Sequence, residues 1–400
     1  MSQFSLTFTR NSLKMVTRTI INAINELIQV YPIIVLTGPR QSGKTTLLRN
    51  MFTEYRYVSL ENPDNRSFAE NDPNGFLELY DQKVIFDEVQ RVPTLLSYLQ
   101  TIVDDSKMMG QFILSGSQNF NLMKNITQSL AGRVGLFKLL PFDFAELKSA
   151  NLLPSDYPEI IVKGCYPTLY DRPMPTTAFY ANYVETYLER DVTDLLSVKD
   201  INLFRTFLKL CAARIGQQLN ITNLSNESGI SVPTVKSWLS ILESSYILYQ
   251  LPPFFNNFNK RLVRSSKLYF YDTGLACFIL GIKSEIALTE GSFKGALFEN
   301  LVINEYVKQN FHKNLYHNFY YWRDSNGHEV DLMVSNETAY DVVEIKATKT
   351  ILSRLFDGLD LLASIGKDTI SRKILVYGGQ QTQNRTHYRV WAWQDIAIGF

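Results

Sequence analysis

One short segment near the start of the chain has the residue types and spacing of a loop that binds phosphate. Residues 38–45 read G-P-R-Q-S-G-K-T and match the pattern G-x-x-x-x-G-K-[ST]. Gly38 and Gly43 let the backbone curl so that its N–H groups point into one concavity, which the start of the next helix extends. Lys44 would reach the β- and γ-phosphates, and Thr45 would offer its hydroxyl to Mg²⁺. The sequence therefore predicts ATP and Mg²⁺ as cofactors. The predicted nucleotide-binding residues are Gly38, Pro39, Arg40, Gln41, Ser42, Gly43, Lys44, Thr45 and Thr46.

Two acidic residues, Asp87 and Glu88, would complete this site. They follow an apolar run at residues 84–86 that reads as a buried strand. At the end of such a strand the carboxylate of Asp87 can hold Mg²⁺ through water. Glu88 would polarise the attacking water as a general base. Because an acid directly after the aspartate favours a hydrolase over a kinase, the pair predicts ATP hydrolysis.

Two further positions are candidates for roles beside the γ-phosphate. Ser117 and Gln118 follow the next apolar run, where a polar residue would position the attacking water; the alternative is a plain turn. Arg133 is a candidate arginine finger or sensor that stabilises transition-state charge. It would act in its own chain or from a neighbouring subunit of a homo-oligomer. The alternative for Arg133 is a surface ion pair.

Four charged residues near the C-terminus have an order that suits metal-dependent phosphodiester cleavage. Glu299 lies in a predicted helix, Asp331 in a predicted strand, and Glu344 and Lys346 in the next strand. Residues two apart on a strand share a face, so Glu344 and Lys346 point the same way. Asp331 can converge with Glu344 on Mg²⁺, and Glu299 would bind the metal through water. Lys346 would orient the water that the metal activates, or stabilise the leaving charge.

The order of helix Glu, then Asp, then Glu-x-Lys resembles the PD-(D/E)xK nuclease core. The resemblance implies a restriction-endonuclease-like domain with Glu299, Asp331 and Glu344 at a metal and Lys346 as a catalytic residue. Alternating charges on a strand are otherwise usually a solvated face. The alternative is therefore a retained fold that serves binding or oligomerisation and does not cleave.

The middle of the chain predicts two helices joined by a glycine-containing turn. Residues 220–225 begin the first helix, and 232–242 form the second, with Ser231 as its N-cap. A strand at 246–251 would follow, which completes the sequence shape of a winged helix. The residues predicted to face the core are Val235, Trp238, Leu239 and Leu242.

The predicted winged helix has two interpretations, contact with DNA or packing against other domains. Among the exposed positions of its second helix only Lys236 is cationic, which is little for neutralising phosphates. A basic cluster follows the predicted wing strand, with aromatic residues beside it. The cluster is Lys260, Arg261, Arg264 and Lys267, and the aromatic residues are Phe254, Phe255 and Phe258. The sequence does not choose between the two interpretations.

Apolar runs alternate with helical stretches in the first part of the chain, which predicts a parallel sheet between helices. The predicted strands of this sheet are 33–36, 55–60, 83–87 and 111–116, after a helix at 14–30. A second α/β unit is predicted from a helix at 294–309 and strands near 319–323, 329–334 and 341–346. The fold class is thus α/β and multidomain. The predicted domains are an ATPase domain at 1–145, a helical lid at 146–202, a winged helix at 203–285 and a nuclease-like domain at 286–400.

The composition is that of a globular chain. Of its 400 residues 45% are hydrophobic and 20% charged, which excludes a disordered, collagen-like or coiled-coil protein. A formal net charge of +1 excludes a strongly basic nucleic-acid coat but leaves a local basic patch open. The 3 cysteines lie far apart, which fits a reducing cytosol. No signal peptide or membrane-spanning stretch is recognisable, so we expect a cytoplasmic protein without a membrane partner.

Several longer stretches resemble one family. They are FDEVQRVP at 86–93, FILSGSQ at 112–118, SLAGRVGLFKLLPFDFAEL at 129–147, GCYP at 164–167, YLERDV at 187–192 and KLYFYDTGLA at 267–276. With the phosphate loop they resemble prokaryotic AAA+ ATPases of the helicase-loader and initiator-like branch. Within that branch they resemble proteins with a C-terminal domain of unknown function related to restriction endonucleases. Two departures are Cys165, where a second glycine is expected, and the lack of a clear second-sensor arginine in 142–200.

Two functions follow from these features, and both keep ATP hydrolysis. The first is an ATPase acting on nucleic acid, DNA in preference to RNA, whose C-terminal domain is an ATP-regulated, metal-dependent nuclease. The second is an ATP-driven switch whose winged-helix and nuclease-like domains only bind partners or DNA. A third and weaker interpretation is a transcription regulator. Such a protein is expected to have a basic recognition helix, but only Lys236 is cationic among the exposed positions of this helix.

Overall fold

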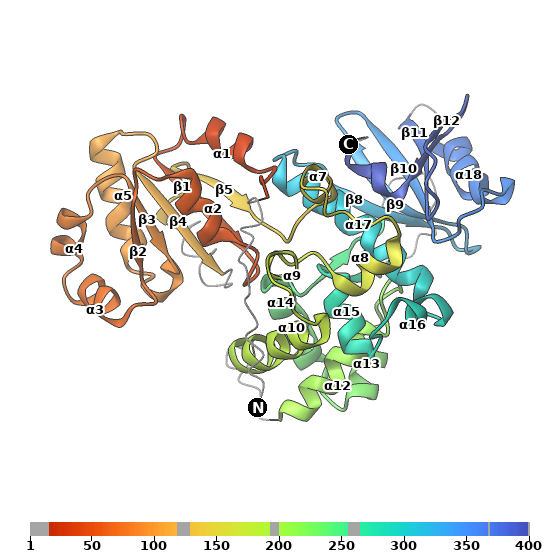
Figure 1. The fold of residues 1–400 in the computed structure, drawn as a ribbon, viewed down its shortest axis with the longest axis horizontal. Coiled ribbons are helices and arrows are strands. Elements are labelled where there is room, and N and C mark those ends of the chain that lie inside the picture. The colour runs from red at the N-terminus through yellow and green to blue at the C-terminus, as the bar shows by residue number, and fades with distance from the viewer. Residues whose placement is uncertain (1–15, 118–128, 193–199, 255–264, 367–368, 399–400) are drawn as a thin grey trace, which may run out of the picture.

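The computed structural model describes residues 16–117, 129–192, 200–254, 265–366 and 369–398. Two β-sheet units lie at opposite ends of the molecule, and a helical region lies between and below them in Figure 1. Of the residues named above, Gln118, Phe255, Phe258, Lys260, Arg261 and Arg264 lie outside the described parts.

The first sheet is parallel and has the order β2-β3-β4-β1-β5. Its strands are β1 (Ile33–Gly38), β2 (Arg56–Ser59), β3 (Val84–Asp87), β4 (Phe112–Ser117) and β5 (Val134–Lys138). The first four confirm the predicted strands to within a few residues. The edge strand β5 was not predicted, because its burial alternates and Leu136 stays 39% exposed, so it lacks a continuous apolar run.

Helices cover both faces of this sheet. They are α1 (Ile21–Leu27), α2 (Lys44–Met51), α3 (Pro63–Asn71), α4 (Pro73–Leu79) and α5 (Leu95–Ser106), with a short 3₁₀ turn η1 (Val89–Arg91). Ile33 and Val35 of β1 belong to the core that contains α4 and α5 side chains. Ile34 and Leu36 belong to the opposite core, with α1 and α2. The continuous apolar run of β1 is thus explained, because a central parallel strand is buried on both faces.

The chain then becomes helical, as predicted. The elements are α7 (Phe144–Ser149), α8 (Tyr157–Lys163), α9 (Thr168–Asp171), α10 (Thr176–Tyr183), the π-helical continuation η2 (Val184–Val192), α12 (Ile201–Ala212), α13 (Ile221–Ser228), α14 (Val232–Ser244), α15 (Thr273–Leu280) and α16 (Glu285–Glu290). A two-stranded antiparallel hairpin of β6 (Leu248–Leu251) and β7 (Lys267–Phe270) stands between α14 and α15.

The predicted pair of helices in this region is present as α13 and α14. Gly229 ends α13 in a left-handed conformation with φ 71, and Ser231 caps α14 by accepting from Thr234 N. The four predicted core residues Val235, Trp238, Leu239 and Leu242 are all buried. This confirms the two helices, while the winged-helix interpretation stays a prediction.

The second sheet is mixed and has the order β12-β13-β11-β10-β9-β8. Its strands are β8 (Phe319–Arg323), β9 (Glu329–Asn336), β10 (Ala339–Lys346), β11 (Ile370–Tyr377), β12 (Gln383–Asn384) and β13 (Arg389–Ala392). The strands β8, β9 and β10 run antiparallel, and β10 pairs in parallel with β11. The remaining elements are η3 (Ser353–Phe356), α18 (Asp357–Gly366) and η5 (Trp393–Ile398).

The long helix α17 (Lys294–His312) joins the regions of the molecule. It contacts β5 of the first sheet, β7 of the hairpin and β10 of the second sheet. Its side chains are buried on all sides along most of its length. One continuous core runs from Leu140 to Ile396 and includes the middle helices, α17 and one face of the second sheet. The three predicted domains after residue 145 therefore share a core, and their boundaries stay predictions.

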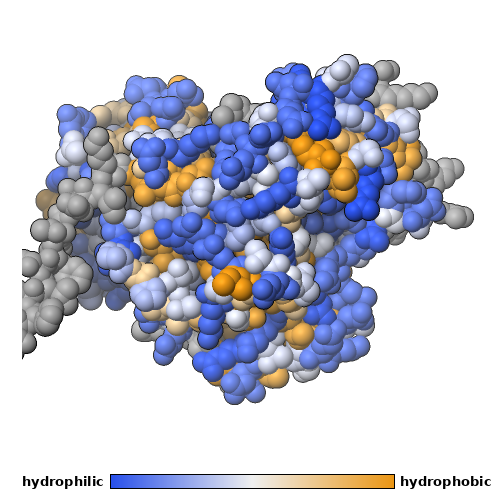
Figure 2. Space-filling model, turned by 45° about the vertical axis from the view of Figure 1, so that its right-hand side comes forward, coloured by the Kyte–Doolittle hydropathy of each residue, from blue (hydrophilic) through white to orange (hydrophobic). Residues whose placement is uncertain are grey.

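The surface is of the ordinary kind for a globular chain. Figure 2 shows one face, on which hydrophobic residues form patches among hydrophilic ones. Large exposed apolar side chains such as Val30, Ile286 and Tyr316 come from separate segments, as expected when some apolar surface always remains exposed. Within the described ranges, every helix is too short or too polar to cross a membrane.

Candidate functional site

The predicted phosphate loop connects the carboxyl end of β1 to the start of α2. Gly38 has φ 150, and a Cβ there would lie 2.2 Å from Leu139 O. Gly43 has φ 92 and stands directly before Lys44, the first residue of α2. Only glycine tolerates both positions, the first because of the close backbone approach and the second because of its left-handed conformation. The two motif glycines therefore shape the loop as the sequence predicts.

The Lys44 side chain is folded into this loop. Its Nζ donates to Gly38 O at 2.9 Å and to Pro39 O at 2.8 Å, and the residue is 7% exposed. Burial lowers the pKa of Lys44 to about 8, although the nearby carboxylates of Glu88 and Asp87 oppose that shift. Because its partners are neutral carbonyls, an incoming phosphate can take their place at the ammonium.

The Asp87 carboxylate accepts hydrogen bonds from hydroxyl groups on α2, β2 and β4. Its Oδ2 accepts from Thr45 Oγ1 at 2.8 Å and from Tyr57 OH at 2.6 Å, and its Oδ1 accepts from Ser115 Oγ at 2.5 Å. The two predicted Mg²⁺ residues Thr45 and Asp87 are thus in direct contact. A hydroxyl and a carboxylate are hard oxygen ligands, so the pair fits Mg²⁺. No pattern in the sequence indicated Tyr57, whose pKa is raised by burial and by its hydrogen bond to Asp87.

Glu88 lies beside the predicted water-positioning residue Ser117. The backbone of Glu88 is left-handed with φ 58, which is uncommon for a residue with a side chain. Its Oε2 accepts from Ser117 Oγ at 3.3 Å and also from Gln90 Nε2, which in turn donates to Ser117 Oγ at 3.1 Å. The fold thus brings the predicted base and Ser117 together, with Gln90 as a third member that the sequence did not indicate.

Arg133 does not lie beside this site. It directly precedes β5, which runs parallel to β1, so it stands at the opposite end of the sheet from the loop after β1. Its guanidinium pairs with the Asp104 carboxylate, with Nε–Oδ1 at 2.5 Å and Nη2–Oδ2 at 2.7 Å. The prediction of a finger acting within its own chain is therefore wrong. A role toward a neighbouring subunit stays a prediction.

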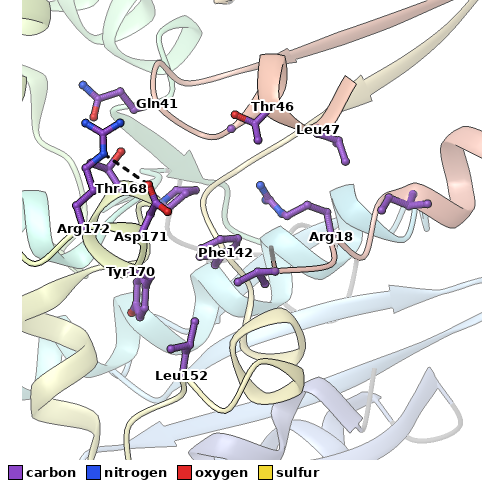
Figure 3. Close-up of a pocket in the computed structure, with 14 residues that line it drawn as sticks. Arg18, Gln41, Thr46, Leu47, Phe142, Leu152, Thr168, Tyr170, Asp171 and Arg172 are labelled. Carbon is purple, nitrogen blue, oxygen red and sulfur yellow. Dashed lines mark ion pairs between the residues drawn. The ribbon is translucent and has the colours of Figure 1, made fainter. Parts of the chain in front are cut away.

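Two adjacent pockets open at the phosphate loop and share Gln41, Gly43 and Thr46. The first, of about 560 Å³, is also lined by Arg40, Lys44, Thr45, Glu61, Glu88, Arg91, Thr186 and Tyr187. The second, of about 330 Å³ and shown in Figure 3, is more apolar. Its other lining residues are Val16, Arg18, Ile21, Leu47, Phe142, Leu152, Pro167, Thr168, Tyr170, Asp171 and Arg172. A polar pocket beside an apolar one suits the phosphates and the nucleoside of one nucleotide.

Arg18 ties the phosphate loop to the rest of the molecule. Its guanidinium donates to Ser42 O at 2.8 Å, to Leu140 O at 2.6 Å and to Glu146 Oε1 at 3.0 Å. In Figure 3 its side chain lies between the loop and Phe142, over whose ring the guanidinium carbon stands at 4.9 Å. The contacts with Leu140 and Glu146 join segments more than a hundred residues apart, so the sequence alone could not show them.

A buried polar junction continues from Glu146 to α17. Asp143, Glu146 and His312 bring ligand atoms within 4.8 Å of one another, which raises the question of a metal. Asp143 and Glu146 form a capping box at the start of α7. His312 Nε2 accepts from Leu140 N at 3.2 Å, so the proton lies on Nδ1, which donates to Asp143 Oδ2 at 2.8 Å. Each of these groups is engaged by protein donors, so we interpret the cluster as a structural junction.

The four predicted residues of the second site come from α17, β9 and β10. Lys346 Nζ lies 3.1 Å from Asp331 Oδ2 and 2.6 Å from Glu344 Oε1. Asp331 Oδ2 also accepts from Ile345 N at 2.8 Å. Glu344 and Lys346 share one face of β10, as the strand period requires, so the predicted convergence of Asp331, Glu344 and Lys346 is observed.

Glu299 lies near enough for the charge of Asp331 to act on it, but it is held from another side. Within the described ranges, the carboxylate oxygens of Glu299, Asp331 and Glu344 do not all lie within 4.8 Å of one another. Glu299 Oε1 accepts from Lys267 Nζ at 3.0 Å and from Tyr269 OH at 2.5 Å, both on β7. Lys267 also pairs with Glu329, and Arg323 pairs with the other oxygen of that carboxylate. Lys267 is 2% exposed, so the expectation that it adds to an exposed basic cluster is wrong.

The carboxylates of this second site are only partly neutralised by the lysines that pair with them. Burial, together with the nearby Asp331 and Glu299, raises the pKa of Glu344 to about 8 against the opposing effect of Lys346. Burial and Asp331 likewise raise the pKa of Glu299. Glu344 Oε2 is buried and has no hydrogen-bond partner among the described residues. An oxygen-only donor set with an unpartnered buried carboxylate oxygen fits a hard divalent cation such as Mg²⁺.

Three family models match successive parts of the chain. An "AAA domain" matches residues 30–148, a "Domain of unknown function (DUF8612)" matches 154–286, and a "Domain of unknown function (DUF4143)" matches 294–396. Together with the loop geometry, the first match shows that the chain contains a P-loop ATPase domain of the AAA type. The other two matches come with no function.

Curated relatives cover most of the chain. "Uncharacterized protein Rv2008c" of Mycobacterium tuberculosis is 31% identical over 329 residues, which are 80% of this chain and 71% of the relative. An uncharacterized protein of Haemophilus influenzae is 22% identical and covers 72% of this chain and 78% of its own. The chain belongs to the same family as the mycobacterial protein.

Solved structures are similar only at a low level. The Walker-type ATPase PABY2304 of Pyrococcus abyssi has a TM-score of 0.43 and 15% identity, covering 65% of this chain and 94% of its own. AMPPCP-bound DnaA from Aquifex aeolicus has a TM-score of 0.30 and 16% identity, covering 56% and 85%. At these values the likeness carries no argument about this chain.

Proposed function

We propose that this protein is an ATPase acting on nucleic acid, and that its C-terminal site is a metal-dependent nuclease site under ATP control. The observation that carries the second half is the convergence of Asp331, Glu344 and Lys346 with an unpartnered buried oxygen on Glu344. The ATPase half is supported by the AAA domain and by the contact of Thr45 with Asp87.

In the first site each residue has a distinct proposed role. The N–H groups of the loop and Lys44 hold the phosphates, and Thr45 and Asp87 hold Mg²⁺, which screens the phosphate charge when bound. Glu88 takes the proton of the attacking water, and Ser117, bonded to Glu88, orients it. The apolar pocket lined by Ile21, Leu47 and Phe142 receives the nucleoside; it supports the proposal because it adjoins the loop directly.

In the second site Asp331, Glu344 and Glu299 would hold a divalent cation, which supplies Lewis-acid activation of water and of the phosphodiester when bound. Lys346, 38% exposed on its side chain, faces both carboxylates and solvent, so it can hold the attacking water or neutralise the leaving oxygen. The substrate class follows from this chemistry, because a hard cation beside a lysine suits a phosphodiester. DNA is preferred over RNA on the strength of the predicted winged helix alone.

The test compares cleavage by the wild type and by the double variant Asp331→Asn/Glu344→Gln. Purified protein is incubated with Mg²⁺ or Mn²⁺ and with single- and double-stranded DNA and RNA, with and without ATP. We expect metal-dependent cleavage in the wild type, none in the double variant, and equal ATP hydrolysis in both. Lys44→Ala serves as the matched control, because it should abolish ATP binding and leave the carboxylates intact. Equal cleavage in the double variant would eliminate the nuclease assignment.

A second candidate function is an ATP-driven switch whose C-terminal domain only binds. It is favoured by one observation, the occupation of the carboxylates by Lys346 and Lys267. On this account the lysines replace the metal permanently. ATP hydrolysis without cleavage of any of the four substrates, and without metal binding at Asp331, would favour it.

A further inference from the structure

A lysine from outside the second sheet lies inside the proposed metal site. Lys267 begins β7, and its Nζ stands 3.0 Å from Glu299 Oε1 and 2.5 Å from Glu329 Oε1. Its side chain is 3% exposed, and its ammonium lies 5.4 Å from the centre of the Tyr321 ring. Since Tyr269 also donates to Glu299 Oε1, that oxygen already has two donors from the hairpin.

The charges of the site show what this lysine does. The described carboxylates are Glu299, Glu329, Asp331 and Glu344, and the ammonium groups among them are Lys267 and Lys346. Lys346 comes from the same strand as Glu344. Lys267 comes from β7 of the hairpin, outside the second sheet, and its ammonium pairs with Glu299 and Glu329, so it is the counter-ion that the hairpin supplies.

We propose that Lys267 is a built-in counter-ion of the C-terminal metal site, and that a divalent cation must displace it from Glu299 to bind fully. This inference rests on the proposed metal site. An ammonium and a divalent cation at the same carboxylate repel each other at a few ångströms in a partly desolvated site. Metal loading therefore weakens the ion pair of the buried Lys267 with Glu299, whereas Lys346, with a side chain that is 38% exposed, can turn toward solvent.

The residues that lead into the hairpin carrying Lys267 contact β1, the strand that ends in the phosphate loop. The strand β7 pairs with β6 along its whole length. Tyr246, two residues before β6, contacts Thr37 Oγ1 through its hydroxyl at 3.2 Å, and Thr37 directly precedes Gly38. Tyr246 has a left-handed backbone with φ 57, so the turn into β6 is set by a special conformation. A chain of contacts thus runs from Lys267 through β7 and β6 to Thr37 beside the phosphate loop, and any coupling of nucleotide with metal along it must be reciprocal.

The experiment is a calorimetric titration of Mn²⁺ into nucleotide-free protein. We compare the wild type with Lys267→Met, and use Asp331→Asn/Glu344→Gln to subtract binding elsewhere. We expect Lys267→Met to bind Mn²⁺ roughly tenfold more tightly than the wild type, because one unit of competing charge has been removed. Unchanged or weaker binding would overturn the inference, since weaker binding would make Lys267 a residue that positions Glu299 for the metal.

A matched control removes a lysine from an ion pair outside the site. Lys148 pairs with Asp395 at 3.1 Å and is 48% exposed on its side chain, so Lys148→Met should bind Mn²⁺ as the wild type does. If wild type and Lys267→Met both bind no more Mn²⁺ than the carboxylate double variant, the proposed metal site itself fails, and this inference with it. If the wild type binds and Lys267→Met does not bind more tightly, only this inference fails.

A second measurement needs no variant. Acetylation of lysine amines with an N-hydroxysuccinimide ester, followed by mass spectrometry, reports how accessible each amine is. We expect Lys267 to react slowly in metal-free wild type and several-fold faster at saturating Mn²⁺, with Lys148 unaffected. An unchanged rate at Lys267 under Mn²⁺ saturation would overturn the displacement.

Discussion

The two candidate sites both place a lysine at the centre of a cluster of oxygens, but the oxygens differ. In the phosphate loop, Lys44 is bonded to the neutral carbonyls of Gly38 and Pro39. In the C-terminal site, Lys346 and Lys267 are bonded to carboxylates. When a phosphate replaces the carbonyls at Lys44, the ammonium gains a partner of opposite charge. When a metal replaces an ammonium at the C-terminal carboxylates, an existing ion pair must first be broken. The nucleotide site is thus ready for its ligand, and the second site is already partly neutralised.

The largest expected effect separates the chemistry of the two sites. Glu88→Gln should lower ATP hydrolysis by about 10²- to 10⁴-fold, because the general base is lost while the loop and Lys44 still bind the nucleotide. Steady-state phosphate release and equilibrium binding of a fluorescent ATP analogue measure both quantities. Hydrolysis within tenfold of wild type would remove Glu88 from the proposed role. Equal Mn²⁺ binding at the C-terminal site in this variant would confirm that the sites are chemically separate.

A second prediction compares the stabilities that the two kinds of lysine confer. Lys267→Met should lower the free energy of unfolding by about 3 kcal/mol, because it leaves Glu299 and Glu329 without their buried partner. Lys44→Met should stay within about 1 kcal/mol of wild type, because burial already opposes the charge of Lys44, as its lowered pKa shows. Urea unfolding at pH 7 without metal measures both. Equal losses in the two variants would contradict the contrast.

A smaller effect concerns the junction of α17 with the ATPase domain. Burial raises the pKa of Glu305 to about 8, from 4.5 in a solvated glutamate, so the folded protein binds an extra proton between these values. Stability should therefore fall as pH rises across this window, by about 1 kcal/mol per pH unit from this group. Glu305→Gln should remove that part of the slope. Urea midpoints from pH 5 to 8 in both proteins test it, and parallel slopes would show that Glu305 is ionised throughout.

Asp143 at the same junction should act in the opposite direction and at lower pH. Burial alone would raise the pKa of Asp143, but the hydrogen bonds that it accepts from His312 Nδ1 and Glu146 N lower this pKa to about 2. Its contribution to stability is therefore present above about pH 4 and is lost as pH falls toward 2. The two windows do not overlap, so the slope assigned to Glu305 can be measured without interference from Asp143.

The sequence could predict what is encoded locally. Two buried strands, Ile33–Gly38 and Val84–Asp87, begin as continuous apolar runs and end in the phosphate loop and in the acidic pair. The place of the nucleotide site at one edge of the sheet could therefore be predicted from the positions where these strands end. The order of Glu299, Asp331 and Glu344 was also readable, because α17, β8, β9 and β10 follow one another in the chain with short connections. These parts were predicted within a few residues of their observed positions.

What depends on distant contacts could not be read from the sequence. Lys267 belongs by its neighbours to a basic stretch, and only the pairing of β7 with β6 and the packing of α17 turn it toward Glu299. Arg18 finds its partners 24 to 128 positions away. Arg133 looked like a candidate for the nucleotide site, but the parallel register of β1 and β5 places it at the opposite end of the sheet.

One measurement tests most directly whether the molecule contains two separate metal sites. Mn²⁺ binding is measured by calorimetry in wild type and in Asp331→Asn/Glu344→Gln, each without nucleotide and with a non-hydrolysable ATP analogue. We expect one metal that binds without nucleotide and is lost in the double variant, and a second metal that needs the nucleotide and is kept in the double variant. Identical Mn²⁺ binding by the two proteins in both conditions would contradict this expectation.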